Sequence, residues 1–139
     1  MNHKKAYITE FVDVKKDTMM NIPSNIAEAL KIKEGTRLLI VADINKMNFV
    51  AYPIVKEERM LAEVKVRMLD KPGALGEIAT ALGEMGINIH TTLIPPSTTG
   101  VSDAYLIVDC TESKVPLTEV EEKLGKLKNT IEVEVNPLE

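Results

Sequence analysis

Few side chains in this sequence are suited to metal binding or covalent catalysis. The only soft metal ligands are His3, His90 and Cys110. Because a transition-metal site needs several such ligands together, we expect no metal and no cofactor. The sequence also lacks a nucleophile with a base beside it, and Gly73 and Gly76 do not form a dinucleotide fingerprint. These observations predict a protein that is not an enzyme.

The segment Asp70-Lys-Pro-Gly-Ala-Leu75 offers a different chemistry, the binding of a small carboxylate. Gly73 lets a ligand come close to the backbone, and a helix that begins here leaves N–H groups around Gly73, Ala74 and Leu75 without intrahelical acceptors. Such N–H groups, at the positive end of the helix dipole, suit a carboxylate. The same residues also make an ordinary turn between a strand and a helix, so both interpretations stay open.

The two halves of the chain carry opposite net charges. Residues 1–57 contain nine Lys and Arg against seven Asp and Glu, whereas residues 58–139 contain eight against fourteen. Only the first half is therefore a candidate to bind nucleic acid, and its excess of two positive charges is small for that role. Lys5 in the tail and Lys15 and Lys16 in a turn are the predicted DNA contacts; a solvated lysine turn is the alternative.

Length and composition indicate a small globular protein that forms oligomers. The chain has 139 residues, of which 45% are hydrophobic. A half of about 60 residues hides too little surface to be stable alone, so we expect a homo-oligomer, either a dimer or a tetramer. The sequence has one cysteine, no signal-peptide pattern and no apolar stretch near the ~18 residues that cross a membrane. The predicted location is the cytoplasm, with no membrane partner.

The second half, residues 61–139, is predicted to be an α+β domain. Residues 61–68 alternate apolar and charged side chains, as in a strand with one buried face, and the helix after them ends at Gly86. The remaining expected elements are strands at residues 88–94 and 104–110, a helix with a capping box from Thr118 to Glu121, and a strand at residues 130–135. The order βαββαβ is the ferredoxin-like plan.

The first half, residues 1–57, is predicted to be rich in β-structure. The expected elements are a strand at residues 6–14, a return strand at 19–22, a helix capped by Ser24 or Asn25, and a hairpin of residues 37–42 with 48–54. The charged run at residues 56–59 marks the junction between the two domains.

The run Asp70-Lys-Pro-Gly-Ala-Leu75, the helix after it and Gly86-Ile-Asn-Ile89 resemble the ACT domain, a ligand-binding module of amino-acid metabolism. The resemblance implies that subunits pair side by side and that an amino acid lies between the first loop of one and the second strand of its neighbour. It also implies that Asp70 and the carbonyl of Asn88 accept hydrogen bonds from the ammonium group of the ligand. The predicted ligand site comprises Asp70, Pro72, Gly73, Ala74, Leu75 and Asn88.

In the first half, Ile22-Pro23, Ile26, Leu30-Lys-Ile32 and Lys33-Glu-Gly35 resemble the SpoVT–AbrB swapped-hairpin family, whose members are mostly transcription regulators or antitoxins. The resemblance implies a dimeric swapped-hairpin β-barrel. However, Thr18-Met19 stands where the family usually has Gly-Arg, and Ala27-Glu28 stands where arginines are common in DNA-binding members. Lysines elsewhere lack the planar fork with which arginine reads guanine, so they compensate only partly.

These patterns together predict a transcription regulator that responds to a small ligand. An amino acid would bridge ACT domains and change the geometry of N-terminal dimers that bind DNA. In the alternative, the N-terminal barrel only dimerises, and the protein controls a partner protein through direct contacts. The lysine turn favours the first hypothesis, and the missing arginines favour the second.

Overall fold

The computed structural model describes residues 6–54, 59–95, 97 and 99–138. By contacts within the chain, it divides into two compact units, Met1–Glu57 and Glu58–Glu139. Each unit is considered by itself below.

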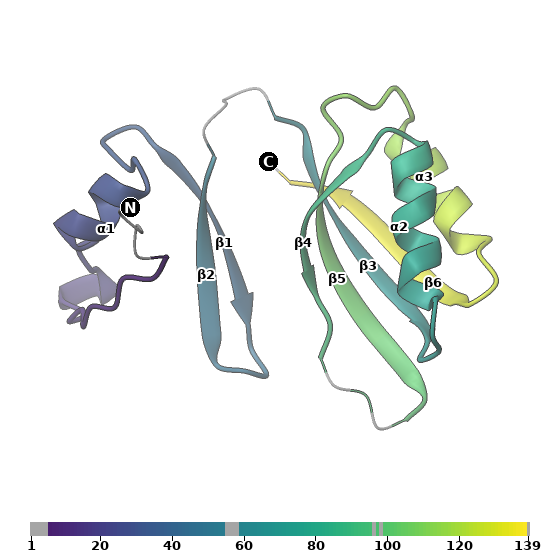
Figure 1. Ribbon diagram of the computed structural model, residues 1–139, viewed down its shortest axis with the longest axis horizontal. Helices are drawn as coiled ribbons and strands as arrows, with labels where there is room; N and C mark the ends of the chain where they lie inside the picture. Colours follow the sequence, from purple (N-terminus) through teal and green to yellow (C-terminus); the bar gives the residue numbers. More distant parts are fainter. Residues whose placement is uncertain (1–5, 55–58, 96, 98, 139) are drawn as a thin grey trace, which may run out of the picture. The chain divides into compact units, whose positions relative to one another are not determined.

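The second unit has the ferredoxin-like order that its sequence predicts. Its elements are β3 (Leu61–Leu69), α2 (Ala74–Glu84), β4 (Asn88–Leu93), β5 (Val101–Asp109), α3 (Leu117–Gly125) and β6 (Thr130–Pro137). The four strands form one antiparallel sheet in the order β4-β5-β3-β6. Both helices cover the same face of this sheet (Figure 1). The α+β prediction for this half is confirmed.

Alternation along β3 separates a buried face from a charged one. Val64 of β3 lies opposite Leu106 of β5, and both are fully buried against the helices, where they meet Leu82 and Leu124. Burial of each such side chain contributes about 1.5–3 kcal/mol. On the other face, the exposed Arg67 donates to the carboxylate of Asp103 (Nε to Oδ1, 2.9 Å).

Some predicted boundaries are wrong by a few residues. β5 begins at Val101 rather than at residue 104. The capping box at Thr118 is also wrong, because α3 already begins at Leu117 and no side chain caps it. The extended conformation of Pro116 sets this start, and its carbonyl accepts hydrogen bonds from the backbone of Glu119 and Val120.

The first unit contains a two-stranded sheet and one short α-helix. β1 (Arg37–Asp43) and β2 (Asn48–Ile54) pair as an antiparallel hairpin, as predicted. The helix α1 (Ser24–Ala29) follows the 3-10 turn η1 (Lys16–Thr18). Neither Ser24 nor Asn25 caps α1, since its N-cap is Pro23 and the Asn25 amide donates to Glu10 instead.

The strands predicted at residues 6–14 and 19–22 are absent from the structure. Both segments lie outside the sheet, and the turn between them closes with a 2.6 Å hydrogen bond from Lys15 N to Met19 O. A strand exists only where another strand completes its hydrogen-bond ladder, and the described residues of this chain supply none. The barrel expected for this half is therefore not formed by a single chain.

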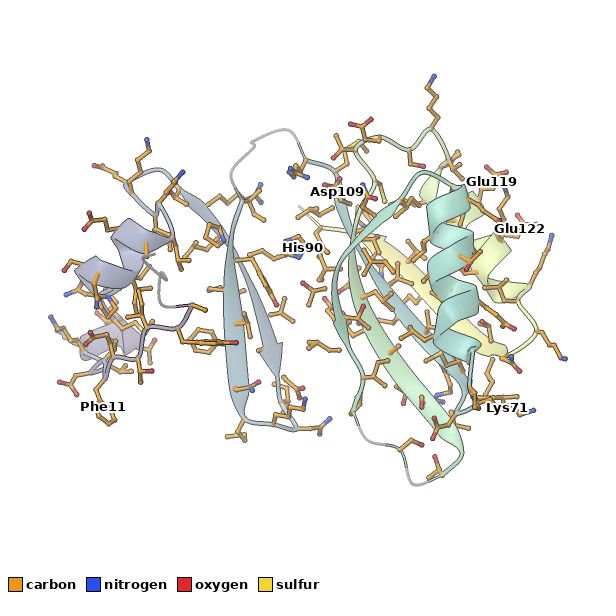
Figure 2. All side chains as sticks on the ribbon, viewed as in Figure 1. Phe11, Lys71, His90, Asp109, Glu119 and Glu122 are labelled. Atoms are coloured by element: carbon orange, nitrogen blue, oxygen red, sulfur yellow. The ribbon has the colours of Figure 1, made fainter. Side chains whose placement is uncertain are left out.

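Residues 6–54 contain no buried side chain. Large apolar side chains are instead open to solvent, including Phe11 (Figure 2) and Tyr7, which is 88% exposed. An isolated hairpin is marginally stable at best, because no further strand or helix packs against its apolar face. The first unit is thus an incomplete fold.

Candidate functional site

The loop between β3 and α2, together with the first two residues of α2, holds five of the six predicted ligand-binding residues. After Leu69, the backbone N–H of Asp70 donates to Gly100 O (2.9 Å), which ties the loop to the start of β5. Gly73 is the N-cap of α2, with a left-handed φ of 87°. A Cβ added there would meet nothing within 4 Å, so the backbone conformation, and not crowding, requires glycine.

Two N–H groups at the start of α2 are open to a ligand. The Ala74 N–H already donates to Lys71 O (3.2 Å), and the Glu77 N–H donates to Gly73 O (3.0 Å). Within the described part of the chain, the N–H groups of Leu75 and Gly76 have no acceptor, and no side chain caps the helix. These two donors lie at the positive end of the helix dipole, where a carboxylate is stabilised, whereas the predicted donor of Ala74 is already occupied.

Asp70 and Asn88 lie at opposite ends of the sheet. Asp70 follows the last residue of β3, whereas Asn88 is aligned with Asp109, which is itself aligned with the first residue of β3. The nine residues of β3 separate the two ends by about 30 Å, at roughly 3.3 Å per residue. Lys71 and Asp109 mark these ends in Figure 2. One chain therefore does not bring Asp70 and Asn88 together.

Both polar side chains are exposed and available. Among the described residues, neither the carboxylate of Asp70 nor the amide of Asn88 has a hydrogen-bond or ion-pair partner. A site that uses both residues needs two copies of the chain.

A buried carboxylate that the sequence analysis missed lies beside Asn88. The Asp109 carboxylate accepts hydrogen bonds from the backbone and hydroxyl of Thr111 and forms an ion pair with Arg59. Burial alone would raise the pKa of Asp109, but these partners outweigh it and hold the pKa below its usual value. The spacing Asp109-x-Thr111 is that of an Asx turn and was a signal available in the sequence.

The exposed face of α2 carries four small residues, Gly76, Ala79, Thr80 and Gly83. We call this set the small-residue stripe. A Cβ added to Gly76 or Gly83 would meet nothing within 4 Å. Since glycine inside a helix costs about 1 kcal/mol relative to alanine, nothing within one chain explains these two glycines. Close approach of another backbone would explain them.

The predicted DNA contacts are only partly described. Lys15 and Lys16 are exposed at η1, whereas Lys5 lies outside the described residues. His90 lies two positions after Asn88 in β4. The register of β4 shifts between Ile89 and Thr91, so simple alternation does not relate His90 to Asn88.

Two further properties concern the described residues as a set. They include no cluster of three or more His, Cys, Asp or Glu that could hold a metal ion. None of their helices is long and apolar enough to cross a membrane.

Comparison with known proteins assigns the second unit. Residues 62–129 match the ACT domain family. This part of the chain is an ACT domain. The assignment fits the observed βαββαβ order, and it indicates a regulatory role that involves a small ligand. No curated protein matches the chain.

Several solved structures are similar to part of this chain at low sequence identity. The C-terminal domain of the MgtC protein from Mycobacterium tuberculosis is 13% identical, with a TM-score of 0.51 over 62% of this chain and 95% of that one. The ACT domain from GTP pyrophosphokinase of Chlorobium tepidum is 24% identical, with a TM-score of 0.45 over 55% of this chain and 97% of that one. A homoserine dehydrogenase from Thiobacillus denitrificans is 20% identical, with a TM-score of 0.46 over 58% of this chain and 18% of that one.

Proposed function

We propose that this protein is a homo-oligomeric regulator that binds an amino acid between the ACT domains of two subunits. The observation that carries the proposal is the pair of open N–H groups, Leu75 and Gly76, at the end of a loop that begins with the unpartnered carboxylate of Asp70. The amides would accept the carboxylate of the ligand, and Asp70 would accept hydrogen bonds from its ammonium group. In this proposal the ligand is bound and released unchanged.

Antiparallel pairing of α2 with its copy would complete this site. Asp70 precedes the first residue of α2 by four positions, and Asn88 follows the last residue by four. A two-fold axis across the middle of the helix therefore places Asp70 of one subunit near Asn88 of the partner subunit. The small-residue stripe supports this arrangement, because it lets two helix backbones approach closely.

Replacing Gly76 and Gly83 together with leucine tests the pairing. In a single chain both changes raise helix propensity, so the helix of the monomer becomes more stable by up to about 1 kcal/mol per site. Across a close helix pair the leucines clash, so we expect monomers by analytical ultracentrifugation and a loss of amino-acid binding. Ala79→Ser, a small replacement on the same face, is the control. A leucine variant that keeps both its oligomeric state and ligand binding would contradict the pairing.

Calorimetry of the full chain with each of the twenty amino acids tests the sensing proposal itself. We expect saturable heat with at least one of them. Asp70→Ala should weaken that binding by about tenfold or more, because hydrogen bonds to a charged group contribute about 1.5–3 kcal/mol each. Absence of heat with every amino acid would reject the proposal.

For the first unit, we propose that a second copy supplies the missing strand partners, as in a swapped-hairpin barrel of the SpoVT–AbrB type. The support is the absence of any buried side chain in residues 6–54, together with a formed hairpin and exposed apolar side chains such as Phe11. An exchange of extended segments between copies would cover these side chains without any new chain segment.

We further propose that this dimer contacts DNA through Lys15 and Lys16, which a two-fold axis would present in duplicate. Replacing both with alanine should reduce the slope of log affinity against log salt by roughly two to four, about one for each phosphate that lysine no longer neutralises. A gel-shift series over salt concentration on genomic fragments measures this, with Lys46→Ala in the hairpin turn as control. An unchanged slope, or no binding at low salt, would favour the alternative, in which the dimer controls a partner protein. The missing arginines at residues 18–19 and 27–28 support that alternative.

A further inference from the structure

Asn129, which lies between α3 and β6, holds both ends of the candidate ligand loop. Its backbone carbonyl accepts a hydrogen bond from Leu69 N (2.9 Å), at the end of β3. Its side-chain amide donates to Glu77 Oε1 (3.0 Å), in the first turn of α2. Glu77 in turn donates its backbone N–H to Gly73 O (3.0 Å). One residue far along the chain therefore spans the loop from its beginning to its end.

The partly buried carboxylate of Glu77 lowers the stability of the fold. Its second oxygen, Oε2, is buried and is the one buried side-chain polar atom among the described residues that lacks a hydrogen-bond partner. A buried acceptor without a donor destabilises a fold, and each such atom in a native protein requires an explanation. If the Glu77 side chain turned out to solvent, water would hydrogen-bond to Oε2 and remove this destabilisation. The fold nevertheless keeps Oε2 buried and Glu77 hydrogen-bonded to Asn129.

The position of Glu77 affects the orientation of the two open donors, the N–H groups of Leu75 and Gly76. Leu75 and Gly76 immediately precede Glu77 in the first turn of α2, and no side chain caps this helix end. If Glu77 moves, the first turn can fray, because the early N–H groups of a helix have few backbone bonds to hold them. A fixed Glu77 thus keeps the N–H groups of Leu75 and Gly76 pointing in one direction.

We infer that Asn129 and Glu77 are positioning residues that clamp the loop of residues 69–77 in the geometry that receives the ligand. This inference rests on the proposed function, since it concerns the same site. Preorganised donors bind more tightly than donors that must be ordered at the moment of binding. The clamp therefore contributes to affinity without touching the ligand.

Amide hydrogen exchange of the full chain tests the clamp without any ligand. Asn129→Ala keeps the backbone bond to Leu69 but removes the bond to Glu77. We expect the amides of Ala74 and Glu77 to exchange at least about tenfold faster in this variant and in Glu77→Ala. The double variant should exchange no faster than either single one, because both remove the same bond. Glu77→Gln, which keeps an acceptor for Asn129, should restore most of the protection.

A matched control exists on β6. There the Asn136 side-chain amide donates to Glu134 Oε1 (2.9 Å), the same chemical pair on an exposed strand away from the loop. Asn136→Ala should leave the exchange of Ala74 and Glu77 unchanged. If Asn129→Ala also leaves it unchanged, or if Gln at position 77 fails to restore it, the clamp is rejected.

Calorimetry with the twenty amino acids, each added alone, supplies the second readout. Asn129→Ala and Glu77→Ala should lower the affinity of any amino acid that binds the wild type by about tenfold, whereas Asn136→Ala and Glu77→Gln stay close to wild type. Unchanged affinity in Asn129→Ala would overturn the positioning role. If no amino acid binds the wild type, the sensing proposal fails, and the exchange experiment alone decides on the clamp.

Discussion

A fragment of residues 1–57 is expected to unfold on dilution, whereas a fragment of residues 59–139 keeps its unfolding temperature. Every buried residue of the described chain lies between Ala62 and Val135, so the second unit contains its own core. Residues 6–54 contain none, and we propose that a second copy covers their apolar side chains. A fold that depends on a partner loses about 2.7 kcal/mol of stability over a hundredfold dilution.

Circular dichroism of both fragments from about 100 µM to about 1 µM measures this effect. Phe11→Ser should move the transition of the short fragment to higher concentration, because Phe11 is fully exposed in one chain and would be covered in the dimer. Glu28→Gln, a change at an exposed position of helix α1, should leave the concentration of this transition unchanged. A short fragment that stays folded as a monomer would show that residues 6–54 need no second copy.

The ACT half was predictable because its signals are local. Alternation over residues 61–68 reports a strand with one buried face, and β3 has that burial pattern. Gly73 and Gly86 begin and end the helix between them through their left-handed conformations. Each of these features depends on neighbouring residues alone.

The first half was predicted less well, because some of its expected strands have no partner strand among the described residues. Residues 37–54 form the expected hairpin, whose two strands are neighbours in sequence. Residues 6–14 have the side chains of a strand but no adjacent strand among the described residues. Pattern alone cannot state whether the strand that completes a ladder belongs to the same molecule.

For the candidate site, the sequence predicted the loop but not what surrounds it. Residues 70–75 form a contiguous motif that marks a strand-to-helix turn. The contacts of Asn129 with Glu77 and of Arg59 with Asp109 join residues 52 and 50 positions apart. Such contacts exist only after the chain has folded. The four residues of the small-residue stripe are visible in the sequence. Only the structure shows that the space around its glycines is open, which supports close approach of another helix.

The split site predicts a specific pattern of complementation between two weakened variants. Asp70→Ala and Asn88→Ala should each weaken amino-acid binding by about tenfold or more, since each removes a polar partner from every site of the oligomer. In a mixed dimer, however, the Asn88→Ala chain contributes an intact loop and the Asp70→Ala chain contributes an intact Asn88. One of its two sites is therefore complete.

The most direct measurement is calorimetry on an equal mixture of the two variants, unfolded and refolded together. Random association makes about half of the dimers mixed, so we predict that about a quarter of the wild-type number of sites returns, at wild-type affinity. Each variant refolded alone should show no sites of wild-type affinity. A mixture in which every site binds as weakly as in its components, while the wild type binds tightly, would contradict a ligand site shared between two ACT domains.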